Sequence, residues 1–267
     1  MNALTRGKLS WVLACGLIAP CVLAKPAIHR PDPPKDDEAK ATEAAIAILK
    51  RADKATKAVM LIRYDAKWEG TGWVENRTWK LQGTVIASKE TDDKPQVFLI
   101  VVTAQAPGSG EERRYTAGSD GTVFFLIDSK EKLVYEDSDR TFMGKGGRIA
   151  QSLAMIEFVH ATPFTDELTG QKALLLGTET VGGEECDRVS VVYANGQEAE
   201  WCFSKRDSLP RRVDRIVKNA DGEKAKRVLT ITNLVVDPQL PEDTFKLKVP
   251  EGFKKTDDLA PGARIPM

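Results

Sequence analysis

The feature that most constrains this chain is a long succession of short segments in which apolar and polar residues alternate. Alternation with a period of two indicates a β-strand with one buried face and one exposed face. Clusters of Gly, Asp and Ser separate the segments, and this favours an antiparallel meander. The expected strands are residues 59–68, 79–88, 96–105, 113–118, 122–128, 132–137, 172–180, 186–193, 198–205, 209–219, 226–236 and a closing strand over 244–249.

Two of these segments are apolar on both faces, because every residue from Phe98 to Val102 and from Phe124 to Ile127 is apolar. So many strands in one flat sheet would curl. The strand count therefore predicts a mainly β (α+β) domain with a curved antiparallel sheet and a helix on one face. A closed barrel is the competing architecture.

Two segments have helical periodicity instead. Residues 37–57 are rich in Ala, Glu and Lys and contain no Gly or Pro, which predicts a long N-terminal helix. Its apolar stripe is Ala45, Ile48, Leu49 and Ala52. A second helix is expected over residues 148–160, with a stripe made of Ile149, Leu153, Ile156 and Val159.

The N-terminus has the pattern of an export signal. Arg6 and Lys8 precede an apolar run that ends in the small-residue site Val22-Leu23-Ala24. This run is short for a membrane span, so we expect a cleaved signal peptide at residues 1–24 and a periplasmic protein; an uncleaved membrane anchor is the alternative. A Pro-rich tether over 25–36, one domain over 37–255 and a tail over 256–267 complete the expected organisation.

Export also changes the expectation for the cysteines. Cys186 and Cys202 remain after signal removal, and an oxidising compartment favours disulfides. Strand parity puts both on the more polar face of one hairpin, around the turn Ala194-Asn195-Gly196. We expect a disulfide between them, although direct opposition requires the turn to be centred on Ala194.

The composition does not favour an enzyme or a nucleic-acid-binding protein. Basic and acidic residues balance at 39 each, so no general attraction to nucleic acid is expected. Removing residues 1–24 takes away Arg6 and Lys8 and no acidic residue, which leaves 37 against 39, or −2. His29 lies in the tether and His160 ends an apolar helix, and no nucleophile, phosphate-loop or metal-ligand motif accompanies them. We expect no enzyme activity and no cofactor.

Three short motifs occur in a recognisable order. They are Lys94-Pro95-Gln96-Val97-Phe98, the stretch Ser119-Asp120-Gly121 before Thr122 to Phe125, and the end of the chain from Thr244 to Gly252. In this order the chain resembles the LolA/LolB superfamily of periplasmic lipoprotein carriers and related uncharacterised periplasmic proteins of that fold, over about residues 37–255. The resemblance implies an unclosed half-barrel with a helical lid segment, whose concave face holds lipid or lipoprotein acyl chains.

Strand parity and the helix stripe supply candidates for the lining of such a hollow. They are Phe98, Ile100, Phe124, Leu126, Leu153, Ile156, Trp201, Phe203, Phe245 and Leu247. The resemblance also implies that the residue before Pro95 latches the lid through helix carbonyls, and here that residue is Lys94. A membrane-bound periplasmic partner would fit the same family. Two alternatives remain: a periplasmic sensor or protein-interaction module on this fold, and a structural β-domain with a packed interior.

Overall fold

The computed structural model of this chain describes residues 35–138 and 147–256. The expected signal peptide, nearly all of the tether and the tail after Thr256 lie outside the described residues. The residues that are described belong to one compact unit.

All eleven strands expected before the closing strand are confirmed, with ends shifted by at most three residues. In chain order the strands are β1 (Leu61–Thr71), β2 (Lys80–Ser88), β3 (Phe98–Gln105), β4 (Glu112–Ser119), β5 (Phe124–Asp128), β6 (Leu133–Asp137), β7 (Lys172–Val181), β8 (Glu184–Val192), β9 (Glu198–Ser204), β10 (Pro210–Lys218), β11 (Lys224–Val236) and β12 (Lys254–Thr256).

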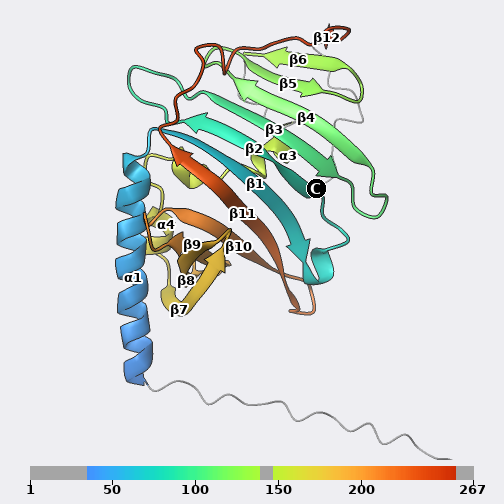
Figure 1. Ribbon diagram of the computed structural model, residues 1–267. Coiled ribbons are helices and arrows are strands. Elements are labelled where there is room, and N and C mark those ends of the chain that lie inside the picture. The colour runs from blue at the N-terminus through green and yellow to red at the C-terminus, as the bar shows by residue number, and fades with distance from the viewer. Residues whose placement is uncertain (1–34, 139–146, 257–267) are drawn as a thin grey trace, which may run out of the picture. The chain divides into compact units, whose positions relative to one another are not determined.

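These strands form a single sheet made of two meanders. Its order is β12-β6-β5-β4-β3-β2-β1-β11-β10-β9-β8-β7. Pairing of β1 with β11 joins the meanders, for example at Trp68 and Leu229, and all neighbours are antiparallel except β12 and β6. The sheet curves into an open half-barrel with β12 at one edge and β7 at the other (Figure 1). The expected half-barrel is therefore confirmed, and the closed barrel is wrong.

The long N-terminal helix is also confirmed, as α1 (Lys35–Ala58). Its predicted stripe is buried, with Ala45, Leu49 and Ala52 fully inaccessible to solvent. This stripe packs the helix against β7 and the short helix α4 (Thr165–Leu168), at the end of the sheet that holds β7 to β9 (Figure 1). A 3-10 turn, η1 (Gly72–Val74), follows β1.

The helix expected over 148–160 is wrong. The chain makes only one turn of α3 (Arg148–Gln151), becomes extended at Met155 with ψ 95°, and makes a second turn at η2 (Ile156–Phe158). We call residues 151–159 the strap. Only part of the predicted apolar stripe is buried: Ile149 and Leu153 are buried, but Ile156 is 54% exposed.

The closing strand over 244–249 is wrong as well. This segment forms turns and irregular backbone on the convex side of the sheet, where Leu247 and Phe253 pack against Phe125, Ile127 and Val134. Val249 is 42% exposed. The segment thus supplies the cover that the two-sided apolar strand β5 requires on its outer face.

The expected disulfide is not formed, and Cys186 and Cys202 are free, buried thiols. The hairpin loop is centred on Asn195, because Tyr193 pairs with Gln197. Cys186 consequently lies opposite Ser204, and Cys202 lies opposite Arg188. The two thiols are diagonal neighbours in a small buried cluster with Val181. Burial raises the pKa of both, that of Cys202 to about 12.

The C-terminal end of α1 is held to the sheet by Lys89, just after β2. Its ammonium donates to the carbonyl oxygens of Thr56 and Lys57, at 2.7 and 3.0 Å. Carbonyls in the last turn of a helix have no partner within the helix, and a cation there also interacts favourably with the helix dipole. The contact expected for Lys94 is therefore made by Lys89, whereas Lys94 lies exposed in the turn between β2 and β3.

Exchanging these two lysines for an uncharged side chain of similar length separates their roles. Lys89→Met should lower the free energy of unfolding by about 1–2 kcal/mol, because two helix-end carbonyls lose their charged donor. Lys94→Met, the matched control, should change it by less than about 0.5 kcal/mol. Urea denaturation measures both values, and equal effects of the two substitutions would contradict the capping role of Lys89.

Candidate functional site

An apolar cavity of about 400 Å³ lies on the concave face between the sheet and the strap. Strands β1, β2, β3 and β5 form its floor, and the strap forms its roof. Its lining is Ile62, Tyr64, Val85, Ala87, Gln96, Phe98, Ile100, Phe124, Gln151, Ala154, Met155, Ile156 and Val159. This volume lies within the range of small-molecule binding sites.

Four of the ten predicted lining residues line this cavity: Phe98, Ile100, Phe124 and Ile156. Four others, Leu126, Leu153, Trp201 and Phe203, are at most 1% exposed and belong to the continuous core beside it. Phe245 and Leu247 lie in the C-terminal segment, and neither is part of the cavity wall. Strand parity therefore grouped cavity and core residues together, and it also included Leu247, which packs on the convex side.

The prediction missed the contribution of the first two strands. Ile62 and Tyr64 on β1, and Val85 and Ala87 on β2, share the cavity wall with β3. The signal for them was present, since each pair has the two-residue spacing that puts both side chains on one face. The sequence did not indicate Met155 as a lining residue, because its segment was expected to be a helix whose apolar stripe excluded this position.

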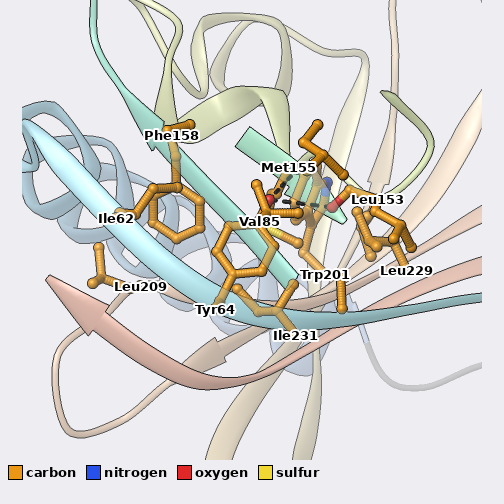
Figure 2. Packing of buried hydrophobic residues seen from close by; sticks show 14 of the residues in the cluster. Ile62, Tyr64, Val85, Leu153, Met155, Phe158, Trp201, Leu209, Leu229 and Ile231 are labelled. Carbon is orange, nitrogen blue, oxygen red and sulfur yellow. Dashed lines mark hydrogen bonds between the residues drawn. The ribbon is translucent and has the colours of Figure 1, made fainter. Parts of the chain in front are cut away.

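The strap is attached to the sheet through the hydroxyl of Tyr64. This hydroxyl donates to the carbonyl oxygen of Leu153 at 3.2 Å and accepts from the amide of Met155 at 2.8 Å (Figure 2). Tyr64 is 1% exposed, and burial raises its pKa far above the ordinary value. The phenol therefore stays protonated and can donate and accept at once.

The other half of the concave face is filled by aromatic side chains. Phe164 makes edge-to-face contacts with Trp201 and Phe203, each at 5.3 Å between ring centroids. Trp201 and Phe203 in turn stack at 5.9 Å. The indole nitrogen of Trp201 donates to the Tyr193 hydroxyl at 3.2 Å, and Tyr193 donates to Glu167 at 2.7 Å. This packing leaves the cavity confined to the β1–β5 side.

A second, smaller hollow of about 210 Å³ lies on the opposite side of the strap. It shares Gln151, Ala154, Met155 and Ile156 with the apolar cavity, but its other walls come from β1, β10 and β11. Glu157 projects from the strap into this region and lies 3.5 Å from Arg215. Burial raises the pKa of Glu157 to about 7, with Arg215 opposing the shift and Glu167 adding to it.

The part of the chain that the structure describes shows no cluster of three or more His, Cys, Asp or Glu residues arranged to hold a metal ion. Within the same residues, no helix has the length and apolar character needed to span a membrane.

Comparison with known families identifies the family of this chain. The model of the DUF2092 family, described as "Predicted periplasmic protein", matches residues 93–257. The chain belongs to this family. The match contains β3 to β11, the strap and the C-terminal segment, whereas α1, β1 and β2 lie before it. It confirms the part of the expected resemblance that named uncharacterised periplasmic proteins. No curated protein matches the chain significantly.

Several solved structures are similar to this chain at low sequence identity. The lipoprotein LppX from Mycobacterium tuberculosis is 14% identical, with 74% of this chain and 98% of LppX covered and a TM-score of 0.46. MucB in the Pseudomonas aeruginosa MucA/MucB complex is 14% identical, with 77% of this chain and 61% of MucB covered and a TM-score of 0.42. A LolA superfamily protein from Nitrosomonas europaea is 12% identical, with 76% of this chain and 97% of that protein covered and a TM-score of 0.33. This chain thus spans less than two thirds of MucB, and none of these likenesses indicates a ligand or partner.

Removing the Tyr64 hydroxyl should release the strap. In Tyr64→Phe the Met155 amide and the Leu153 carbonyl lose their buried partner, which should cost about 1–3 kcal/mol. Hydrogen exchange at the Met155 amide should become faster by roughly fivefold to a hundredfold, since every 1.4 kcal/mol changes the opening equilibrium tenfold. Amides in the β1–β2 ladder serve as the internal control. Unchanged exchange at Met155 would show that other contacts hold the strap.

The raised pKa of Glu157 predicts a pH-dependent stability. Between about pH 4.5 and 7 the folded protein keeps a proton that the unfolded chain has released, so stability falls as the pH rises through this window. Glu157→Gln should therefore be more stable than the parent at pH 8, by up to roughly 3 kcal/mol, and close to it at pH 4.5. Thermal unfolding at both pH values tests this, and an equal difference at both would refute it.

Proposed function

We propose that this protein is an exported periplasmic carrier, released by cleavage after residue 24, that holds the acyl chain of a lipid or lipoprotein in the cavity beneath the strap. The observation that carries the proposal is the apolar cavity of about 400 Å³ beside a fully packed core. Most of its wall is aliphatic or aromatic, as expected for a site that recognises hydrocarbon.

The chemistry of the wall favours binding over catalysis. Its polar side chains are Tyr64, whose hydroxyl is bonded to the strap backbone, and the amides of Gln96 and Gln151. None of these groups is an acid, base or nucleophile at neutral pH. The proposed role is therefore that of a binding protein and not of an enzyme.

The exposure of Ile156 supports an opening at the strap. A large aliphatic side chain that is 54% exposed at the rim of an apolar cavity gains by contact with a hydrocarbon ligand. Each methylene removed from water contributes about 0.8 kcal/mol. A long acyl chain thus supplies enough energy for micromolar affinity after the cost of ordering ligand and strap is subtracted.

The two other candidate roles make different demands on the same face. A structural domain requires no ligand, and an interaction module would bind protein without needing an accessible cavity. Only the carrier requires that the delipidated protein take up an apolar molecule at the strap. That uptake is the property to test.

A charged residue at the rim should abolish uptake without unfolding the protein. Delipidated parent protein should bind the uncharged apolar fluorophore N-phenyl-1-naphthylamine with micromolar affinity, and Ile156→Asp should weaken binding at least about tenfold, a loss of 1.4 kcal/mol or more. The melting temperature should stay within about 2 °C of the parent, because Ile156 is largely solvated already.

The matched control is Ile46→Asp, at an exposed isoleucine on α1 that is outside the cavity wall. It should bind the fluorophore as the parent does. Absence of binding by the delipidated parent, or equal loss in both variants, would refute the carrier proposal.

A further inference from the structure

Two arginines lie directly opposite each other on the concave face, at the hollow behind the strap. Arg215 on β10 pairs in register with Arg227 on β11. Their outer neighbours in the same row are Ala199 on β9 and Gly70 on β1, two of the smallest residues. Like charges facing each other across a strand pair destabilise a sheet. A local arrangement that opposes stability is expected mainly where a functional site requires it.

On the convex face of the same two strands, basic side chains form ion pairs with carboxylates. There Arg212 pairs with Glu179 and Asp214, and Lys226 pairs with Glu200 and Asp214. Lys224 has the same kind of partner in Glu198, at 2.7 Å. Cations on that face are thus matched with carboxylates.

On the concave face the two arginines are not matched by an equal number of carboxylates. No ion pair joins Arg227 to any carboxylate in residues 35–138 or 147–256. Over the same residues the carboxylate paired with Arg215 is Glu157, at 3.5 Å, and the guanidinium of Arg215 lies 6.0 Å from the centre of the Trp201 ring. The side chain of Arg215 remains 51% exposed. The raised pKa of Glu157 means that this carboxylate is ionised in only part of the molecules near pH 7. The pair therefore keeps most of its positive charge.

The pair lies at a hollow that adjoins the apolar cavity. Both arginines line the hollow of about 210 Å³, together with Trp68 and Leu229. This hollow and the apolar cavity share Gln151, Ala154, Met155 and Ile156 of the strap, so a ligand that reaches around the strap could occupy both. Paired guanidinium groups match the oxygen atoms of carboxylates and phosphates in geometry and charge.

We propose that Arg215 and Arg227 form the headgroup site for an anionic amphiphile, whose acidic group is a carboxylate or a phosphate and whose acyl chain occupies the apolar cavity. This inference rests on the proposed function and adds to it the charge of the ligand. Trp68 provides an amphipathic wall at the level where chain and headgroup meet.

Three ligands with the same eighteen-carbon chain test the inference: oleate, 1-oleoyl lysophosphatidic acid and the neutral 1-oleoylglycerol. Each displaces N-phenyl-1-naphthylamine from the delipidated protein, below its critical micelle concentration. We expect at least one acid to bind tenfold or more tightly than 1-oleoylglycerol at low salt, and the preference to shrink at 0.5 M salt. Preference for oleate alone identifies a carboxylate site, and preference for the phosphate alone identifies a phosphate site.

Arg215→Gln and Arg227→Gln should each reduce the preference to less than threefold and leave the affinity for 1-oleoylglycerol unchanged. Lys224→Gln removes a charge from the convex face of the same strand and should leave the preference intact. Equal binding of all three ligands by the parent, or a preference that survives both arginine variants, would overturn the headgroup site while the carrier function stands. Failure of all three to bind would overturn both.

Discussion

The cavity depends on one buried hydroxyl. Tyr64 holds the carbonyl of Leu153 and the amide of Met155 at the point where the strap crosses the sheet. A buried backbone amide or carbonyl must find a partner, and in a non-helical segment that partner must come from elsewhere in the chain. Because Tyr64 satisfies both groups, the strap can remain extended at Met155 and roof the cavity without filling it.

The strap also divides the concave face into regions of different character. Towards β9 the aromatic cluster of Phe164, Trp201 and Phe203 is closely packed, and such pairs add about 0.5–1.5 kcal/mol each beyond the area they bury. This packed half offsets the cost of leaving apolar surface unfilled on the other side. Between them the strap exposes Ile156 and buries Glu157, so that the apolar and charged hollows meet at neighbouring residues.

Much of the fold could be predicted from the sequence because its local signals agree with its tertiary structure. The alternating strands and α1 follow from period and composition. Residues 124–127 are apolar on both faces, and the structure covers both faces of this strand. The sequence did not show which segment covers the convex face of β5, or in what conformation. The alternation from Thr244 to Val249 is that of a strand, but the segment forms turns, packs Leu247 on an existing sheet face and pairs with no strand.

The site shows the same limit. Parity placed Phe98, Ile100 and Trp201 on one face, yet only the first two line the cavity. The difference is set by the strap, whose bonds to Tyr64 join residues about ninety positions apart, and no local pattern encodes such a contact. The disulfide failed for a related reason, because a loop centred one residue further along shifts every cross-strand partner by two.

The most direct test is to locate an acyl chain by the isoleucine methyl groups of the protein. Ile62, Ile100 and Ile156 line the cavity, whereas Ile48 packs within the core and Ile127 packs on the convex face. When 1-oleoylglycerol is titrated into the delipidated, methyl-labelled protein, binding in the cavity predicts saturable shifts of the first three methyl signals and none of the last two. Saturable shifts confined to Ile127 or Ile48, or no shifts at all, would contradict a ligand site beneath the strap.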